Sequence, residues 1–533
     1  MKKLFVTILL ALVAASFFTM YTSRDQSSDV PVITWRTDAN PQREEQIMLF
    51  REWLVANGHV RKDKNGNVVN YTQKEADALN KAYGTAGKPL DPSSPHYVKA
   101  GTPKPNGDVA LETANNQSTL IQAVSGMAGD LIDHVPVKRF APMGVLEEIT
   151  GFARENGLDP AAGYGEAAGD LLMYGGKQYA YFCNLATRGL LLNLDLFEKY
   201  GVEPPPEEWT PADFERIGRE FVRKANAGRP RQEVFFSGAM PQAILPLARS
   251  LGADVFNETL TAATLTDPAF VRALETYYGW VYRHHLIPTA AEATSTESEG
   301  TSVNSEATPQ LAAGRYGMIL TGRYVNMDLR RFRNGRFRLA FVQLPEWEYK
   351  NLVTTSRNTA IYKGSKHKEQ ARLFLKFLAA KEYNDLIIRS SDGLPPNPEW
   401  AEDNPEFRTP PGREFEGDLH DNELKWTLSI GIPESQSPYY PLGDNKLSYA
   451  FAKVESKLAS PEEALKQAEE AINYSIRSTV EGTASLQEEY RAACERQRQI
   501  DRRKAAGEKI PAGWIRNPFY RKFYRDRGML ADH

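Results

Sequence analysis

Short apolar stretches of strand length alternate with amphipathic stretches of helical spacing along most of this chain. Residues 31–35 read as a buried strand, and Gln42–Ala56 follows with its apolar residues on one helical face. Beyond residue 107 the alternation continues, with strands predicted over 108–114 and 130–137 and a helix over 117–126. Because parallel strands are joined by helical crossovers, this alternation predicts an α/β fold, with mainly parallel sheets flanked by helices. Ligands of such folds bind beyond the carboxyl ends of the strands.

Later segments continue this pattern, with two exceptions. Thr210-Pro-Ala-Asp213 has the residues of a helix start, namely a threonine cap, a first-turn proline and an acid. Residues 57–107 are polar and rich in Gly, Lys, Asn and Pro, which indicates an inserted excursion, and the Ser- and Thr-rich stretch 289–307 is predicted to be a mobile loop. Other helices are predicted around 242–251, 268–284, 366–380 and 461–477, and an extended run over 174–188.

The first residues have the charge and apolar pattern of an export signal. Lys2 and Lys3 precede an uncharged apolar run over residues 4–21. Small residues at 13–16 offer cleavage sites, yet the run is about as long as the shortest bilayer span. We therefore expect a periplasmic or otherwise extracytoplasmic protein, in which residues 1–29 are either a removed signal peptide or a membrane anchor with a linker. No cysteine lies near this run, so we do not expect a lipoprotein.

Composition and charge exclude several other classes. The 533 residues are 41% hydrophobic, enough for two or three domains. Residues 491–533 hold 12 Lys and Arg against 5 Asp and Glu, so the remaining chain is acidic, which argues against a nucleic-acid partner. The two cysteines, Cys183 and Cys494, exclude cysteine-based zinc modules but leave one long-range bridge possible. No metal-binding histidine pair, phosphate-binding loop or nucleophile elbow occurs, so we predict no metal, no cofactor and no enzyme activity.

Four blocks, in order, carry the pattern of one family. They are LLLNLDLFEKYGVEPPPEEW at 190–209, LAAGRYGMILTGRY at 311–324, FVQLP at 341–345 continued by 358–383, and SPEEALKQAEEAIN at 460–473. Together they resemble the extracellular solute-binding proteins of ATP-driven sugar importers, the family that includes maltose-binding protein. The blocks are spread over most of residues 30–480. The excursion 57–107 and the tail 491–533 depart from the family pattern, and the resemblance implies nothing about them.

The resemblance implies a two-lobed binding-protein fold whose hinge has three crossings, near 180–189, near 350–358 and within 395–435. Lobe I would comprise 30–183 and 353–395, lobe II would comprise 184–352 and 396–490, and 491–533 would be a basic C-terminal extension. It further implies a monomer that captures a mono- or oligosaccharide between the lobes and delivers it to the permease subunits of an importer. Two alternatives remain open, a membrane-anchored carbohydrate sensor or scaffold, and a secreted glycoside hydrolase.

Sugar sites need aromatic platforms together with planar hydrogen-bonding groups, and such residues follow the predicted strands. Tyr439 and Tyr440 lie near the position of an aromatic residue that lines the family's cleft late in the sequence, and one of the two is expected to belong to the core. The arginines at 36, 188, 323 and 357 would suit a carboxylated sugar. The candidate ligand residues are Trp35, Arg36 and Asp38 after the first strand, Asp133 and His134 after the third, Asn184, Arg188 and Arg357 at the crossings, Tyr324 in the position of the family's stacking aromatic, and Tyr439 and Tyr440.

The basic tail from residue 491 ends in several aromatic residues, and two interpretations stay open. It forms either a solvated helix followed by a segment packed on the outside of one lobe, or a surface that contacts a membrane or a partner protein.

Overall fold

The structure is a computed structural model that describes residues 31–531 apart from 39, 41, 85, 86, 114, 115, 160, 297–306 and 442. The expected signal or anchor, residues 1–29, and residues 297–306 of the expected loop lie outside the described residues. Ala290–Thr296 forms a helix, α12, so the loop prediction is wrong for these residues. Within the described part of the chain, no helix is both long and apolar enough to cross a bilayer.

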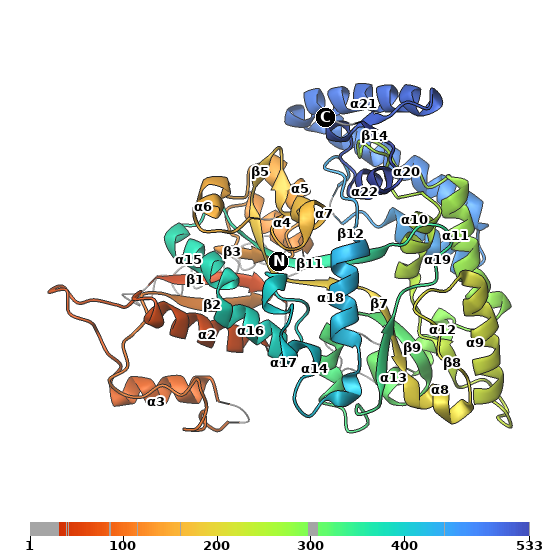
Figure 1. The fold of residues 1–533 in the computed structure, drawn as a ribbon. Helices are drawn as coiled ribbons and strands as arrows, with labels where there is room; N and C mark the ends of the chain where they lie inside the picture. Colours follow the sequence, from red (N-terminus) through yellow and green to blue (C-terminus); the bar gives the residue numbers. More distant parts are fainter. Residues whose placement is uncertain are drawn as a thin grey trace, which may run out of the picture.

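Six strands form the first sheet, in which β1, β2 and β3 with their flanking helices make lobe I (Figure 1). Strand β11 extends beyond β3 and pairs there with β12 on the side of lobe II, whose core includes Leu352. Its parallel pairs are β1 with β2, β1 with β3, and β11 with β12, whereas β11 runs antiparallel to β3 and to β6. Helices α2 and α15 cover one face, where Trp35 packs against Phe374 with ring centroids 4.9 Å apart. The bounds are β1 Val32–Thr37, β2 Asp108–Thr113, β3 Leu131–Asp133, β6 Ala180–Thr187, β11 Leu352–Ile361, β12 Gly431–Pro433, α2 Gln42–Ala56 and α15 Lys368–Ala379.

Four strands form the second sheet, the centre of lobe II, in the order β10-β7-β9-β8. Helix α9, Pro211–Ala225, begins as predicted, because the Thr210 hydroxyl accepts the Asp213 N–H and the Asp213 carboxylate accepts the Thr210 N–H. Phe214 of this helix stacks on Trp280 with ring centroids 4.0 Å apart. The strand bounds are β7 Gly189–Asn193, β8 Phe235–Ser237, β9 Tyr316–Thr321 and β10 Leu339–Val342.

The predicted two-lobed α/β fold is confirmed, but its sheets are more mixed than the expected mainly parallel ones. In the two large sheets, every antiparallel pair of the described strands involves β7 or β11. Each of these two strands comes directly after a passage between the lobes, so it enters its sheet from the direction opposite to that of its antiparallel neighbours. The chain passes between the lobes from β6 to β7 at Arg188 and from β10 to β11 within 343–351. It passes between them again through α18, Leu419–Ile430, which leads to β12. The exact domain limits stay a prediction.

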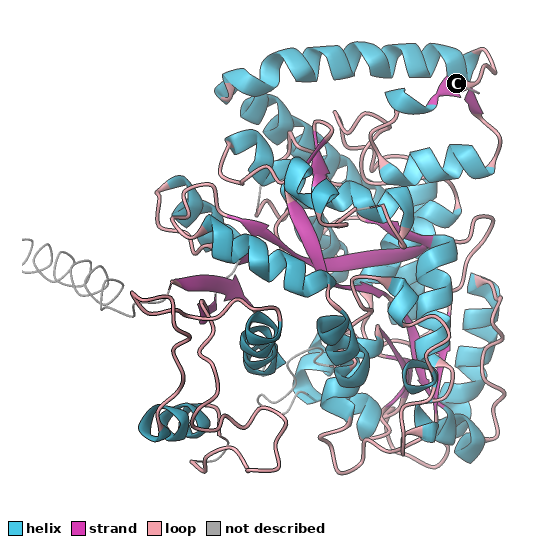
Figure 2. Cartoon of the chain, turned by 60° about the vertical axis from the view of Figure 1, so that its left-hand side comes forward, coloured by secondary structure: helices cyan, strands magenta, loops and turns pink. Residues whose placement is uncertain are grey.

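Two segments extend beyond the two lobes. The excursion 57–107 carries α3, Gln73–Ala82, and reaches away from lobe I (Figure 1). Arg51 of α2 fastens it by donating to the hydroxyls of Tyr71, at 2.9 Å, and Tyr83, at 3.0 Å. At the other end, residues 484–531, called here the C-terminal segment, lie over both lobes in two views (Figures 1 and 2).

The C-terminal segment is a packed part of the molecule. Its helices are α21, Ala484–Ala505, and α22, Pro518–Asp526. Phe519 and Phe523 of α22 are buried against Tyr349 and Ile432, and the Tyr349 and Phe523 ring centroids are 4.9 Å apart. Of the two interpretations of the tail, the structure therefore favours the one in which it packs on a lobe.

The two cysteines do not pair, because both are free thiols. Cys183 is fully buried in β6, and burial raises the pKa of its thiol well above the usual range.

Removing the Phe519 ring tests how firmly the C-terminal segment is docked. Phe519 is fully buried, so Phe519→Ala should leave a cavity and lower the free energy of unfolding by about 3–5 kcal/mol. Tyr474→Ala, at a side chain that is 67% exposed, is the control and should stay within about 0.5 kcal/mol. Urea unfolding of both variants measures this, and equal stability of Phe519→Ala and the parent protein would contradict the packing described here.

Candidate ligand-binding cleft

Strand β11 sets the position of the cleft through its pairing. Thr354 pairs with Pro433 of β12 and with Thr187 of β6, so β12 and β6 lie on opposite sides of β11. Thr359 pairs in the same way with Asp133 of β3 and Tyr181 of β6. Strands β3 and β12 therefore lie on the same side of β11, with their carboxyl ends pointing toward each other. Residues 355–358 of β11 span the gap between these two ends, at the junction of the two lobes that is called the cleft below.

A cavity of about 250 Å³ lies on the lobe II side of this cleft, and Arg139 is the one residue among its described lining that comes from lobe I. Arg139, from α5 (Val137–Phe140) just after β3, lines it from lobe I, and Glu434, Ser435 and Tyr440, just after β12, line it from the other side together with Gln242. The Arg139 guanidinium lies 5.5 Å from the centroid of the Tyr440 ring. Burial lowers the pKa of Arg139, with Tyr440 and Asp444 acting in the opposite direction.

Two buried polar atoms at this cavity lack a hydrogen-bond partner among the described residues. They are Nε of Arg139 and Oγ of Ser435, one from each side of the cleft. A buried donor without an acceptor costs free energy, so such atoms are usually satisfied by water or by a ligand. Their position therefore marks the cavity as a place where a polar ligand would be bound from both sides.

The ends of β1 and β3 hold a cluster around Asp133, three of whose members were predicted from the sequence. The Asp133 carboxylate accepts from Nε1 of Trp35 at 2.7 Å, from the Thr37 hydroxyl at 2.6 Å and from Arg357 at 3.1 Å. Trp35 is fully buried and Arg357 is 3% exposed. The structure thus brings Trp35, Asp133 and Arg357 together inside lobe I, and contact of these three with a ligand stays a prediction.

Asp38 is held by an arginine that the sequence analysis missed. Nε of Arg43 donates to Asp38 at 2.8 Å, and the same guanidinium forms an ion pair with Asp392. Burial alone would raise the pKa of Asp38, but the adjacent Arg43 outweighs it and holds that pKa well below the usual range. Arg43 is 2% exposed, at the beginning of α2. An arginine on the apolar face of that helix was a signal of a buried ion pair, but its buried partner, Asp392, lies 349 positions away.

The remaining predicted residues are spread along the same region. Arg36 forms an ion pair with Glu112 at 2.7 Å, and its Nε and Nη1 are buried with no partner among the described residues. Asn184 donates to the Asp392 carbonyl, and Arg188 and Tyr324 are half-buried. His134 is exposed at the end of β3, with a left-handed φ of 53°. Tyr439 is fully buried, its ring centroid 4.9 Å from that of Tyr490, whereas Tyr440 lines the cavity.

Behind the cleft, Arg323 and Glu423 connect the lobes. Arg323, fully buried next to Tyr324, donates to the carbonyls of Gly393 at 2.6 Å and Ile388 at 3.0 Å. Glu423 of α18 accepts the backbone N–H of Thr187 at 3.1 Å and that of Arg323 at 2.5 Å. Burial raises the pKa of Glu423 to about 7, against the opposing effect of these donors. Arg323 and Arg357 are thus both engaged within the protein, which leaves the idea of a carboxylated sugar with less support from the arginines.

A model of the bacterial extracellular solute-binding protein family matches residues 94–385, more than half of the chain. The chain belongs to this family. A binding protein of Brucella abortus is 23% identical over 234 residues, which are 42% of this chain and 52% of that protein. The chain therefore matches about half the length of this relative.

Solved structures show the same two-lobed fold. An ABC substrate-binding protein of Listeria monocytogenes, in complex with cycloalternan, superposes with a TM-score of 0.61 at 21% identity over 84% of this chain and 99% of its own. A maltose/maltodextrin-binding domain of Bdellovibrio bacteriovorus, bound to maltotriose, has a TM-score of 0.58 at 14% identity over 84% of this chain and 100% of its own. For this solute-binding protein, the gap between β3 and β12 is thus the gap between two lobes of a known binding fold.

The raised pKa of Glu423 predicts a pH dependence of stability. Between its ordinary pKa of 4.5 and about 7, the folded state binds more protons at Glu423 than the unfolded state does. The free energy of unfolding therefore falls as pH rises through this window, by about 3 kcal/mol at most. The variant Glu423→Gln lacks this titration and should not show this part of the fall. Denaturant unfolding at pH 5, 6 and 7 compares the two proteins, and parallel pH curves would contradict the assignment.

Proposed function

We propose that this protein captures a carbohydrate between its two lobes outside the cytoplasmic membrane and delivers it to the permease subunits of an ATP-driven importer. The single observation that carries the proposal is the cavity lined by Arg139, from the helix after β3, and by Ser435, after β12, each of which presents a buried polar atom with no partner among the described residues. Membership of the extracellular solute-binding family supports the class of function. The sugars bound by the Listeria and Bdellovibrio proteins support a carbohydrate as the ligand class.

The chemistry of the cavity suits one sugar ring. Its volume of about 250 Å³ lies just below the range of about 300–1,000 Å³ for ligand pockets. The Tyr440 ring offers an apolar platform for sugar C–H groups, and Arg139, Ser435, Glu434 and Gln242 offer donors and acceptors for hydroxyls. This set contains both donors and acceptors, as the hydroxyl groups of a sugar require.

The hinge geometry explains how binding would be transmitted. Arg139 of lobe I and residues that follow β12 line the cavity, and the described chain passes between the lobes at Arg188, within 343–351 and through α18. A ligand that satisfies Arg139 and Ser435 together favours the arrangement in which the two walls are close. A permease that recognises this arrangement would then receive the loaded protein.

A binding screen with two site variants tests the function. The full chain is titrated calorimetrically with maltotriose, mannotriose and D-tagatose, which relatives of this fold bind. Arg139→Gln and Tyr440→Ala should each weaken binding of the responding sugar at least tenfold, about 1.4 kcal/mol. Tyr324→Ala tests the predicted stacking residue and is expected to act in the same direction.

Matched controls separate the cleft from general effects. Arg389→Gln, at an exposed arginine of lobe I, and Tyr449→Ala, at a tyrosine that is 64% exposed, should leave the affinity unchanged. No binding of any sugar, or equal losses in the controls, would refute the proposal. Release of smaller sugars from maltotriose would instead support the hydrolase alternative.

A further inference from the structure

A second and larger cavity, of about 890 Å³, lies between lobe I, Pro438 and the C-terminal segment. Its described lining residues, which include Lys138 and Pro438, differ from those of the cleft cavity, which include Arg139 and Tyr440. Its volume is within the range of about 300–1,000 Å³ that ligand pockets occupy. We propose that this cavity is a second binding site, for a neutral, hydroxyl-rich ligand such as an oligosaccharide.

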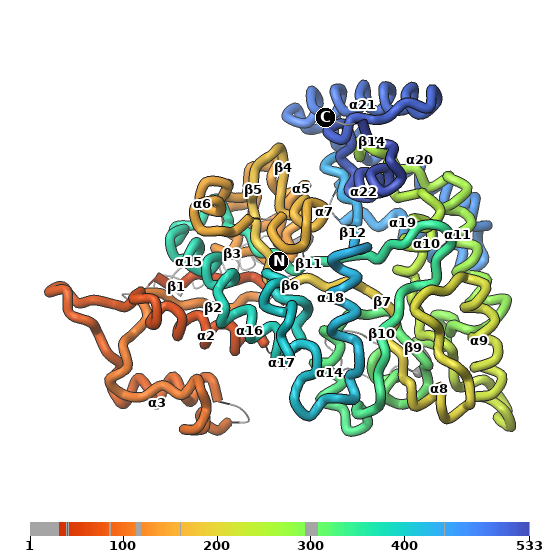
Figure 3. Tube along the Cα trace, viewed as in Figure 1, coloured from red at the N-terminus to blue at the C-terminus, as the bar shows by residue number. Residues whose placement is uncertain are grey.

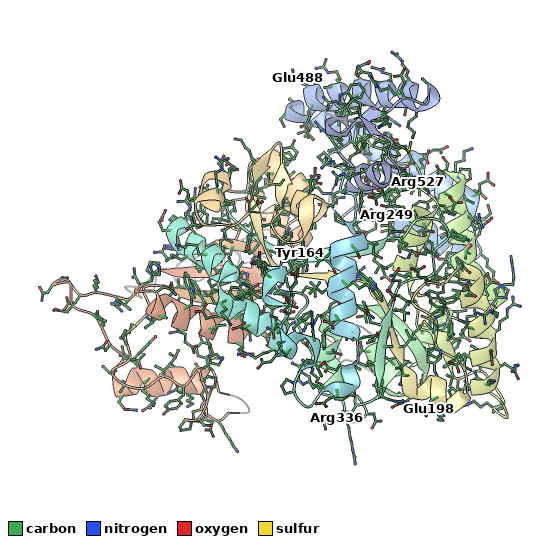
Figure 4. All side chains as sticks on the ribbon, viewed as in Figure 1. Tyr164, Glu198, Arg249, Arg336, Glu488 and Arg527 are labelled. Atoms are coloured by element: carbon green, nitrogen blue, oxygen red, sulfur yellow. The ribbon has the colours of Figure 1, made fainter. Side chains whose placement is uncertain are left out.

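One wall of the large cavity is the C-terminal segment, which is firmly anchored on lobe II. The carboxylate of buried Glu258 accepts from Tyr524 and Lys504, each at 2.7 Å, and its carbonyl accepts the backbone N–H groups of Arg516 and Asn517. The Arg249 guanidinium of lobe II also lies 5.2 Å from the centroid of the Phe519 ring. Figure 4 shows Arg249 close below Arg527 of this segment. Anchored in this way, the wall presents its polar side chains from a fixed position.

The same segment reaches lobe I on the other side of the cavity, where α22 lies beside α7, Gly165–Gly169 (Figure 3). Arg521 forms an ion pair with Glu166 of α7 at 3.0 Å. Glu489 accepts from the hydroxyl of Tyr174 at 2.7 Å and pairs with Arg516 at 2.6 Å. All five side chains line the cavity, so lobe I and the C-terminal segment form one continuous polar lining.

The charges of this lining cancel, which decides the class of ligand. Four basic and four acidic side chains line the cavity, and three of the basic ones are paired with three of the acidic ones. Paired guanidinium and carboxylate groups still have free donors and acceptors for hydroxyls, but offer no excess charge for an ionic ligand. The side chains are Lys138, Arg154, Arg516 and Arg521 with Asp159, Glu166, Asp170 and Glu489.

The lining also has the apolar and backbone surface that a sugar ring needs. Tyr174 and Met173 are half-buried and face the cavity, and Gly175 and Gly176 leave the backbone open beside them. An aromatic ring next to paired charges is the combination by which proteins hold the apolar face and the hydroxyls of a sugar at once.

The chain offers a closely matched pair of variants for the test. Arg521 and Arg525 both form ion pairs with Glu166, but only Arg521 lines the cavity. The full chain and its Arg521→Gln, Arg525→Gln and Arg139→Gln variants are titrated calorimetrically with maltotriose, mannotriose, cycloalternan and trigalacturonic acid. Tyr174→Phe, which keeps the ring and removes the hydroxyl, is a second cavity variant, and melting temperatures confirm that each variant is folded.

We expect one neutral oligosaccharide to bind in an event that Arg521→Gln and Tyr174→Phe weaken about tenfold, while Arg525→Gln and Arg139→Gln change it less than twofold. If all oligosaccharide binding is lost in Arg139→Gln and unchanged in Arg521→Gln, the cleft function stands and the second site is refuted. Equal losses in Arg521→Gln and Arg525→Gln would also refute it, because the effect would then come from the attachment to Glu166. Preference for trigalacturonic acid would overturn the neutral ligand class, and binding of no oligosaccharide would refute the second site.

Discussion

The divided edge of β11 is the constraint on which the rest of this molecule depends. One edge of the strand pairs with β6 from residue 354 to residue 360, so the crossing between the lobes is a two-stranded ribbon. The other edge is shared by β12 at one end and β3 at the other, and no described strand pairs with it between them. A bulge at Arg357 and Asn358 turns the ribbon within this stretch. Within this stretch the Arg357 side chain reaches Asp133 at the end of β3, at 3.1 Å.

Buried charges define the lobe I side of this space. Removing Asp133, Arg357, Arg43 and Asp392 from water costs free energy, which mutual pairing offsets only when the geometry is good. Because a shift of β1 or β3 by one residue would separate these partners, the cluster fixes the register of the strands that end at the cleft. The carboxylate with the most partners, Asp133, also holds the Trp35 indole, so the end of β1 and the end of β3 move as one unit.

The sequence was most informative where local rules apply. The start of α9 followed from the Thr210 and Asp213 cap, and the alternation of strands and helices predicted the α/β class, whereas the two-lobed architecture was implied by the family resemblance. Pairing across long sequence separation was beyond such rules. Arg139 and Ser435 meet at the cavity only because β3 and β12 share an edge of β11, and nothing near either residue in the sequence indicates this. For the same reason the sequence could not tell which of two adjacent tyrosines lines the cavity. Tyr439 is buried against Tyr490, whereas Tyr440 lines the cavity.

The C-terminal segment combines a strong attachment with a weak one, and this difference matters for a hinged protein. On lobe II, buried aromatic side chains and the Glu258 hydrogen bonds hold it, each of which is costly to break. On lobe I, it is held mainly by ion pairs of partly exposed side chains, Arg521 and Arg525 with Glu166, and such pairs contribute about 1 kcal/mol or less. A rotation of lobe I would therefore break these pairs at little cost while the segment stayed on lobe II. A ligand in the large cavity would add contacts to both walls at once, so it would strengthen the connection that is weakest.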